Sequence, residues 1–325
     1  MQNIRRVYIS LLSVVLFTFI FGTATYAWIS INSINSIDGL SLTATTGEQL
    51  QISIDGINYQ QFLETETLEA IFGDVQLKDI TSLNGKTFYT GGLRMVGPAV
   101  ANEDYLSFEL WFRTKEVERH VYLVNNVSSE VTYDQTMLGT YVVSRGVRWV
   151  SKHTFLNGPG EEDIVNQGDE GIYYGSEAIR ISIEEIKAEE NALDIRGDEA
   201  FRTIIYDPSE NPSRGYGTFY GAYHYFMIST GNTFFSLPPY RPDILYRLTT
   251  FEPYDPYQAQ DNDSLVAELI ESDMIDDEGN IYYIGKIRVN VWIEGWDADA
   301  FDAIHRDRIK MQLQFKSGKP FIELG

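Results

Sequence analysis

The pattern of hydrophobic and polar positions changes abruptly near residue 28. Residues 7–21 (VYISLLSVVLFTFIF) form a continuous apolar run behind Arg5 and Arg6. A positively charged start, an apolar run of this length and the small residues at 22–24 are the three parts of a secretory signal. Residues 7–29 also hold no charge and are long enough to span a bilayer, so a retained anchor helix is the alternative. The segment therefore predicts export.

Two fates of this segment remain open. A signal peptidase would cut after Ala24 or Ala27, each of which has a small residue two positions earlier. In a retained helix, Arg5 and Arg6 would stay on the cytoplasmic side and the rest of the chain would lie outside. A retained helix would also be able to pack into the core of a filament. We therefore expect residues 1–27 to be a signal peptide or a membrane or filament-core helix, and residues 28–325 to be an extracellular or cell-surface domain.

After Trp28, apolar and polar residues alternate with a period of two. Asp-Gly and Thr-Gly pairs separate these segments, which is typical of β-hairpins. Runs of strands with little helix predict a mainly β fold, an antiparallel β-sandwich or jelly roll with few short helices, preceded by one hydrophobic N-terminal helix. The later strands are expected at 87–89, 105–114, 120–125, 140–144, 147–150, 178–183, 202–206, 223–228, 280–293 (broken at Gly285) and 309–316. Short helices are expected at 62–72, 264–272 and 297–305, the last with Asp297 as its N-cap.

Charge and composition narrow the range of partners. The chain has 25 Lys and Arg against 47 Asp and Glu, a net charge of −22, so nucleic acid is not an expected partner. It has no cysteine, which excludes disulfides and Cys-based zinc sites. Because 43% of its residues are hydrophobic, it can bury a sizeable core without cross-links.

No catalytic motif is visible. The four histidines are far apart in the sequence, and there is no nucleophile elbow, P-loop or dinucleotide-binding glycine pattern. We therefore predict no catalytic or metal-binding residues, no cofactor and no enzyme activity. Calcium is the one cofactor that the sequence leaves open. Residues 276–280 fit a tight hairpin better than an EF-hand loop, whereas 261–263 and 297–299 are oxygen-rich loops that suit either Ca²⁺ or simple turns.

The stretch from Gly215 to Pro256 is dense in Tyr, Phe and Pro. Such a stretch either covers the core or presents a surface to a partner. On the second interpretation, the residues of an aromatic contact surface are Tyr216, Tyr220, Tyr223 and Tyr240. This interpretation predicts a membrane-anchored adhesin or carbohydrate-binding surface protein.

Two short motifs resemble known secreted proteins. Residues 22–28 (GTATYAW), followed by strand residues up to Leu42, resemble the signal-peptide exit of camelysin and TasA-like matrix proteins of Gram-positive bacteria. Residues 288–304 (RVNVWIEGWDADAFDAI) resemble the C-terminal signature of surface proteins from Firmicutes and Mollicutes that share such an N-terminus. In place of the Gly-Thr-Leu-Asp-Leu run common in the camelysin-like family, this chain has Gly-Leu-Ser-Leu-Thr at 39–43.

The resemblance implies a β-sandwich subunit that self-associates into a homopolymer by lending its N-terminal strand to a neighbour. The segment 28–37 (WISINSINSI) is uncharged and rich in β-branched residues, so it is the expected donor; an ordinary first strand within one chain is the alternative. The residues expected to insert are Trp28, Ile29, Ile31, Ile34 and Ile37. The function that follows is a structural subunit of an extracellular filament, biofilm matrix or surface layer.

Overall fold

The computed structural model describes residues 35–44, 50–72, 75–94, 96–232 and 236–322, together with Val14. The expected mainly β fold is confirmed, since strands make up 40% and helices 11% of the structure. Within these ranges no helix is long and apolar enough to cross a membrane. The hydrophobic N-terminal segment lies outside the described residues apart from Val14, so neither of its two fates is tested.

The first large sheet contains the two ends of the described body. Its central strand, β20 (Arg308–Gly318), pairs with β1 (Asn35–Ala44) on one side. On its other side β20 pairs with β10 (Tyr141–Ser144) and β9 (His120–Leu123). The sheet is completed by β17 (Leu265–Glu268) beside β9, and by β3 (Phe62–Leu63) and β4 (Gln76–Leu77) beside β1.

The second large sheet is built around β19 (Ile281–Glu294) and its neighbours β8 (Leu106–Thr114) and β15 (Ile179–Ile186). In β8 the sequence LSFELWFRT alternates between fully and partly buried side chains, as the pattern predicts for a strand with one face on the core. The remaining strands are β2 (Gln51–Ser53), β5 (Asp79–Thr81), β6 (Tyr89–Thr90), β7 (Gly97–Pro98), β16 (Thr203–Tyr206) and β18 (Ile270–Ile275).

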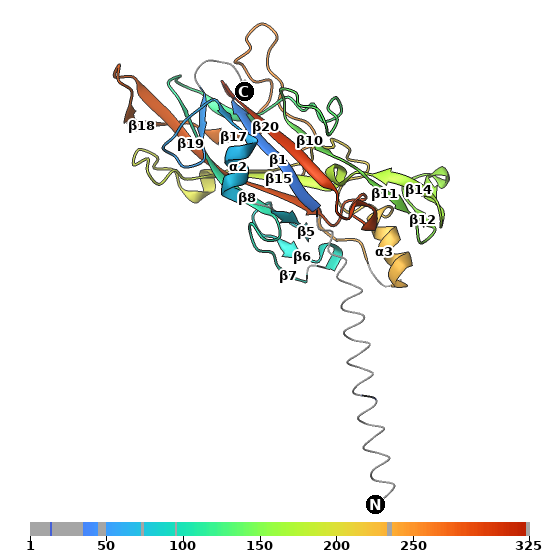
Figure 1. The fold of residues 1–325 in the computed structure, drawn as a ribbon. Coiled ribbons are helices and arrows are strands. Elements are labelled where there is room, and N and C mark those ends of the chain that lie inside the picture. The colour runs from blue at the N-terminus through green and yellow to red at the C-terminus, as the bar shows by residue number, and fades with distance from the viewer. Residues whose placement is uncertain are drawn as a thin grey trace, which may run out of the picture. The chain divides into compact units, whose positions relative to one another are not determined.

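One apolar cluster is built from buried residues of both large sheets. Figure 1 shows the long strands that carry them, β1 and β20 of the first sheet and β8, β15 and β19 of the second. Leu40 and Leu42 of β1 and Phe315 of β20 belong to it, together with Phe112 of β8 and Val289 of β19. The rings of Phe112 and Phe315 meet edge to face with their centroids 5.1 Å apart. The alternating residues of both sheets therefore supply the buried surface that a cysteine-free chain needs.

The expectation of purely antiparallel sheets is wrong at two places. β1 runs parallel to β20 over eight residue pairs, and β19 runs parallel to β5. Parallel neighbours need a long connection, so hairpin signals in the sequence do not report them. The first and last strands of the body meet in this way although about 270 residues separate them.

Smaller elements flank the sheets. β11 (Val147–Val150) pairs with β14 (Glu170–Tyr173), and β12 (Phe155–Leu156) pairs with β13 (Ile164–Val165). The two α-helices among the described residues are α2 (Thr65–Phe72), which lies on β1, and α3 (Ala222–Thr230), which lies beside β12. The 3₁₀ turns are η1 (Gly92–Arg94), η2 (Glu161–Asp163), η3 (Gly175–Ala178), η4 (Asp198–Ala200) and η5 (Asp302–Ile304).

Four local predictions are wrong. Residues 264–272 form the strands β17 and β18 instead of a helix, because β9 and β19 offer them hydrogen-bonded partners, and such tertiary pairing overrides helix propensity. Residues 223–228 lie in α3 instead of a strand. Residues 297–305 contain only η5, and Gly285 does not interrupt β19. The helix expected at 62–72 is confirmed from Thr65 onward.

The α3 segment begins and ends at glycine. Gly221 and Gly231 both have positive φ angles, a conformation that costs glycine little and other residues much more. A Cβ on Gly221 would lie only 2.1 Å from the carbonyl oxygen of Ala298. The Gly221 amide donates to the Leu156 carbonyl and the Ala222 amide to the Ala298 carbonyl. This short aromatic segment is therefore helical although its composition favours a strand, since tertiary contacts hold its N-terminal end.

Candidate functional site

The contact between β1 and β20 is the first candidate site, because β1 begins within the expected donor segment, residues 28–37. Leu42 pairs with Leu313 and Ala44 with Phe315, and all four side chains are buried in the common core. On the opposite face, the Ser41 hydroxyl donates a hydrogen bond to Gln312 Oε1 at 3.0 Å. β1 therefore contributes a full apolar face and a polar face to one slot in the sheet.

The slot is closed on the other side of β1 by short elements. β4 pairs with Asn35 and Ser36, and β3 pairs with Leu42 and Thr43. At the start of the strand, the Asn35 side-chain oxygen accepts a hydrogen bond from the Asp307 amide at 2.7 Å. None of these partners is joined to β1 by a tight turn.

Of the five expected donor residues, the structure describes one. Ile37 lies in β1 opposite Ile309, next to an irregularity in the pairing with β20. Trp28, Ile29, Ile31 and Ile34 lie outside the described residues. The last part of the expected donor segment therefore belongs to a strand that is paired within its own chain, while the fate of the rest stays a prediction.

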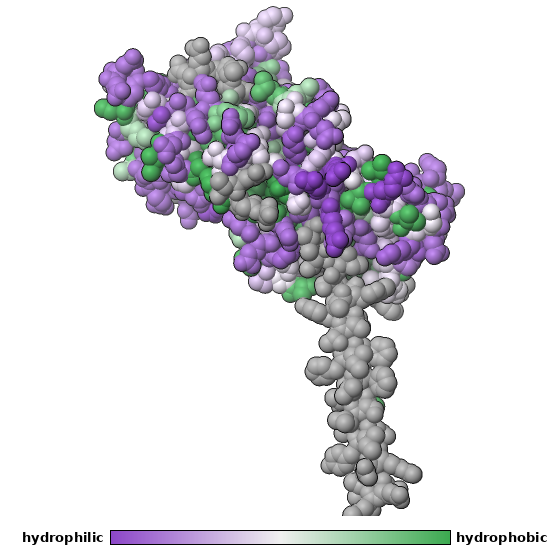
Figure 2. Space-filling view, viewed as in Figure 1, coloured by the Kyte–Doolittle hydropathy of each residue, from purple (hydrophilic) through white to green (hydrophobic). Residues whose placement is uncertain are grey.

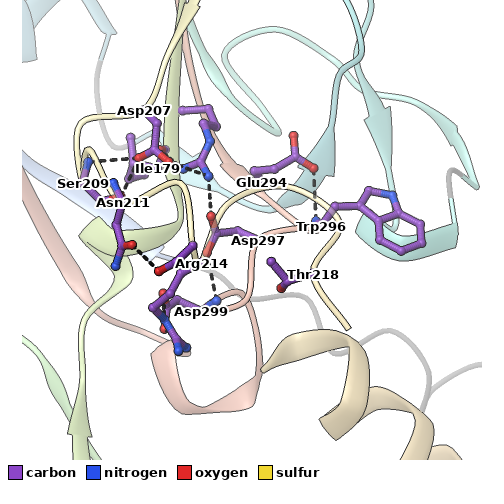
Figure 3. A network of polar contacts seen from close by, with 12 residues as sticks. Ile179, Asp207, Ser209, Asn211, Arg214, Thr218, Glu294, Trp296, Asp297 and Asp299 are labelled. Carbon is purple, nitrogen blue, oxygen red and sulfur yellow. Dashed lines mark hydrogen bonds and ion pairs between the residues drawn. The ribbon is translucent and has the colours of Figure 1, made fainter. Parts of the chain in front are cut away.

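The second candidate site is a buried polar network at the end of the second sheet (Figure 3). It forms where β15 begins and where β16 and β19 end. The Arg180 guanidinium lies between two buried carboxylates: its Nη2 is 2.8 Å from Asp207 and also contacts Asp297. Arg180 Nη1 donates to the Ile179 carbonyl at 2.8 Å. One cation thus links two segments that are 90 residues apart.

A second arginine extends the network. Arg214 donates to both oxygens of Asp299, from Nε at 2.7 Å and from Nη2 at 2.6 Å. Its Nη1 also donates to the Asn157 carbonyl at 2.5 Å. Such bidentate, charge-assisted pairing fixes the relative orientation of two chain segments. Arg214 therefore joins the aromatic excursion to the loop after β19.

Burial controls the charge state of this network. It raises the pKa of Glu294, which accepts hydrogen bonds from the Trp292 indole at 3.0 Å and from the Trp296 amide at 3.1 Å. Burial also raises the pKa of Asp297 and Asp207 above the usual range in spite of Arg180. Burial disfavours the charged form of Arg180, but Asp207 and Asp297 outweigh it and raise the pKa of that guanidinium.

The ion pairs and hydrogen bonds of this network join separate segments of the chain. Asp207, Glu294 and Asp297 are almost completely buried, and each accepts hydrogen bonds or ion pairs from neighbouring groups. A general acid or base has to reach a bound substrate. These carboxyl groups instead hold the ends of β15, β16 and β19 together, a role that disulfides fill in many small exported domains.

Sequence reasoning missed Arg180. In the strand IRISIEEI the alternation assigns this residue to the face away from the shared core, where a charged side chain is normally solvated. That face is covered by a second apolar cluster that includes Phe88, Tyr105 and Trp292. The carboxylates that meet Arg180, Asp207 and Asp297, also come from distant parts of the chain, and no local signal reports that the position is buried.

The expected aromatic contact surface is wrong as a shared exposed platform. Tyr216 is 4% exposed and Tyr220 5% exposed, while Tyr223 is half-buried and Tyr240 is 75% exposed. Tyr216 packs near Trp296, and burial raises its pKa to about 12. The Tyr220 hydroxyl donates to the Ser213 carbonyl. Two of the four rings therefore serve the interior.

Neither loop considered for calcium presents an open ligand set. The carboxylates of Asp297 and Asp299 face arginines, which supply the positive charge that a cation would bring. Asp261 accepts hydrogen bonds from Thr249 and from the Asp263 amide, as in a turn. Over the described ranges no group of three or more His, Asp and Glu side chains is placed to hold a metal. The hairpin expected at 276–280 is present between β18 and β19.

The face of the body seen in Figure 2 is mostly hydrophilic, with hydrophobic residues in small separate groups. Neither this surface nor the two buried sites identifies the chain by itself. No family model, curated protein or solved structure matches this chain.

Proposed function

We propose that this chain is an exported structural subunit that assembles outside the cell by exchanging its first strand between copies. We also infer that the body is a β-sandwich, which is supported by the single apolar core shared by two large sheets. The observation that carries the functional proposal is the slot beside β20, which a strand from the very start of the body fills.

Three features of the slot support strand exchange. β1 overlaps the donor segment at residues 35–37, so a neighbouring chain can present both together. Because β1 is parallel to β20, no tight turn ties it to that neighbour. An empty slot would leave the backbone groups of β20 and the core residues Met311, Leu313 and Phe315 exposed, which favours filling by any matching strand.

Introduced cysteines test the proposal directly, because the chain has none of its own. Ser41 and Gln312 are paired residues of neighbouring strands, whose Cα atoms lie about 5 Å apart, within the range of a disulfide. Cells should co-express one chain carrying Ser41→Cys and one carrying Gln312→Cys. Strand exchange predicts a disulfide-linked dimer of the two chains on a non-reducing gel.

The matched control uses β10 in place of β1. Val142 of β10 and Met311 of β20 are also directly paired. Val142→Cys and Met311→Cys are placed in separate chains, and exchange of β1 does not bring these two positions together between copies, so no linked dimer is expected. The double variant Ser41→Cys/Gln312→Cys, carried in one chain, shows whether the pair can form at all. If the mixed single variants stay unlinked while the double variant links within one chain, strand exchange does not occur.

Truncation provides a second measurement. A chain that begins at Asp38 loses the donor segment and the Asn35 contact with Asp307. We expect the mature chain to form fibres in a concentration-dependent manner and the truncated chain to remain monomeric. Monomers of both chains at high concentration would contradict the assembly function.

A further inference from the structure

The hairpin formed by β18 and the start of β19 carries a concentrated negative charge. Residues 270–281 (IESDMIDDEGNI) contain five acidic residues and no Lys or Arg. Within the described part of the chain, the ion pair that involves this group joins Asp276 to Lys115. Asp273, Asp277 and Glu278 are exposed to solvent. The hairpin therefore presents several carboxylates that a cationic partner can reach.

One face of this hairpin is also apolar and uncovered. Ile275 pairs directly with Ile281, and the two side chains are 65% and 41% exposed. Exposure alternates along β18, so Asp273 lies on the same face as Ile275. By the same alternation, Ile281 lies on the side of β19 where Tyr283 packs against the core.

The hairpin projects beyond its neighbouring strand. β8 ends at Thr114, which pairs with Tyr283, so the first residues of β19 pair only with β18 among the described strands. Figure 1 shows β18 and the adjoining part of β19 extending from the body. The core side of the sheet thus continues onto the hairpin, where two isoleucines face solvent.

A second surface carries arginines that lack an acidic partner. The Arg145 amide donates to the Arg308 carbonyl at 3.0 Å, and Arg306 precedes Arg308 by two residues in the same turn. All three arginines are exposed. Arg308 pairs with Asp38, whereas no ion pair joins Arg145 or Arg306 to another described residue. In a chain with 47 Asp and Glu against 25 Lys and Arg, these two guanidinium groups are available to a partner.

Exposed apolar side chains adjoin these arginines. A Cβ on Gly146, the residue after Arg145, would lie 2.7 Å from the Tyr174 ring and 2.8 Å from Ile172, so both side chains lie against this turn. Ile172 is 54% exposed, and Tyr174 is exposed to a similar extent. We call Arg145, Arg306, Ile172 and Tyr174 the arginine end. Like the hairpin, it combines apolar side chains with charge, but the charge is of opposite sign.

The two surfaces lie at opposite ends of β19. The hairpin is at Ile281, where β19 begins, and Ile293 near its other end pairs with Ile179. Ile179 follows Tyr174 by five residues, which span at most about 18 Å. β19 itself has 14 residues and is about 45 Å long. The hairpin and the arginine end therefore cannot meet within one copy.

We propose that the acidic hairpin of one copy docks on the arginine end of a second copy. The isoleucines of the hairpin pack against Ile172 and Tyr174, and its carboxylates face Arg145 and Arg306. Because the two surfaces differ, the contact repeats from copy to copy and generates a row of subunits or a ring. This inference rests on the proposed assembly function and names a contact within it, but it does not require exchange of β1.

Charge selects this pairing over others. Two hairpins repel each other because neither contains a cation, and most of a body of net charge −22 repels the hairpin as well. Apolar contact alone would not distinguish a hairpin-to-hairpin contact from a contact with the arginine end. Opposite charges at the two ends do distinguish them, and they also fix the orientation of the partner.

Chemical cross-linking of the full-length chain tests the contact, because the chain has no cysteine of its own. Cells co-express one chain carrying Ile172→Cys and one carrying Ile281→Cys, and a short bismaleimide links thiols that lie close together. Head-to-tail docking predicts a linked dimer from the mixture and none from either variant expressed alone.

Ile57→Cys is the matched control for Ile172→Cys. Ile57 is exposed and follows β2, which pairs with β8 at Arg113. Arg113 pairs with Ile284 of β19, so Ile57 belongs to the hairpin end of the body. A chain carrying Ile57→Cys should therefore not become linked to a chain carrying Ile281→Cys.

Charge reversal tests the forces at this contact. Arg145→Glu in the chain carrying Ile172→Cys should reduce the linked dimer at least about tenfold, because like charges then face each other. Arg247→Glu makes the same change of charge at an exposed arginine outside the arginine end and should have little effect. Asp273→Lys in the chain carrying Ile281→Cys should also reduce the linked dimer. Combining Arg145→Glu in one chain with Asp273→Lys in the other should restore it, a result that misfolded variants cannot give.

Three results would overturn the docking contact: equal linking of positions 57 and 281, equal effects of Arg145→Glu and Arg247→Glu, and no restoration in the doubly reversed mixture. Fibre formation by the unchanged chain separates this contact from the assembly function itself. If fibres form while positions 172 and 281 stay unlinked, only the docking contact is wrong. If the unchanged chain is monomeric at high concentration, both proposals are wrong.

Discussion

The two candidate sites stabilise the same body by opposite physical means. The contact of β1 with β20 is dry and apolar on the core side, where Leu42 and Phe315 are fully buried. The network at the end of the second sheet is equally buried but ionic, with Arg180 between Asp207 and Asp297. Apolar contacts tolerate small shifts and exchange of the strand that makes them. Ion pairs in a low-dielectric interior depend on each partner being present.

This difference explains why exchange is proposed at one site and not at the other. A strand from another copy can reproduce the apolar face of β1, and the ion pair between Asp38 of β1 and Arg308 of β20 lies where the arginine side chain is half exposed. Moving one segment of the ionic network would leave a buried charge without its partner, which is strongly unfavourable. In the proposed exchange, the network therefore fixes the part of the body that has to stay rigid. Four changes test this comparison, in order of expected effect.

Arg180→Met is expected to have the largest effect. It leaves Asp207 and Asp297 buried without a cation, and breaking such a pair typically costs about 3–5 kcal/mol. Because burial already raises the pKa of both carboxyls, protonation relieves the defect, so the loss should be smaller at pH 5 than at pH 7.5. Urea unfolding at both pH values measures it. Adding Asp297→Asn should restore part of the stability; a loss below about 1 kcal/mol at pH 7.5 would contradict the ionic role.

Leu42→Ala tests the apolar site. The side chain is fully buried between the sheets, and such truncations cost about 2–5 kcal/mol through lost burial and the cavity left behind. No charge is involved, so the loss should be the same at pH 5 and pH 7.5. A pH-dependent loss would show that the two sites are not independent. Denaturant midpoints for this variant and for Arg180→Met give the comparison.

Glu294→Gln should raise the free energy of unfolding at neutral pH, whereas the two preceding changes lower it. Burial raises the folded-state pKa of Glu294 above the unfolded value near 4.5, so the folded form holds the proton more tightly. Its stabilising effect is then present below the unfolded pKa and is lost as the pH rises through the folded pKa. The Gln side chain does not ionise, so the variant avoids this loss of stability, which is about 1.4 kcal/mol for each unit by which the fold raises the pKa of Glu294. The melting temperature, measured from pH 4 to 8, should vary less with pH in the variant than in the unchanged chain. The same pH dependence in both chains would contradict this role of Glu294.

Arg148→Ala is expected to have the smallest effect. Its ion pair with Glu170 joins β11 to β14 on the surface, where both side chains are largely exposed. Exposed pairs contribute about 0–1 kcal/mol because water and salt screen them. Unfolding in low and high salt provides the measurement. A loss of stability as large as that of Arg180→Met would contradict the expectation that an exposed ion pair contributes less than a buried one.

The alternation in β8 was sufficient to predict this strand, because one of its faces lies on the core and the pattern records that face. The strands expected at 140–144, 147–150 and 309–316 are also present, as β10, β11 and β20, although β10 and most of β20 are buried on both faces. Residues 264–272 show the limit of this approach. Their composition favours a helix, but they form two strands because they pair with β9 and β19. β19 follows β18 through the hairpin at 276–280, but β9 lies more than 100 residues earlier in the chain, and a local window contains no information about it.

The sequence by itself determined the strand-rich character, the acidic surface, the absence of disulfides and the uncharged N-terminal stretch, because these follow from residue type and short-range order. Only the tertiary structure decided that β1 lies parallel to β20, that Arg180 is buried between two carboxylates and that Tyr216 and Tyr220 point inward. Each of these facts depends on which distant segment covers a given face. Covering a face changes its dielectric surroundings and its access to water, and neither can be read from one residue and its neighbours.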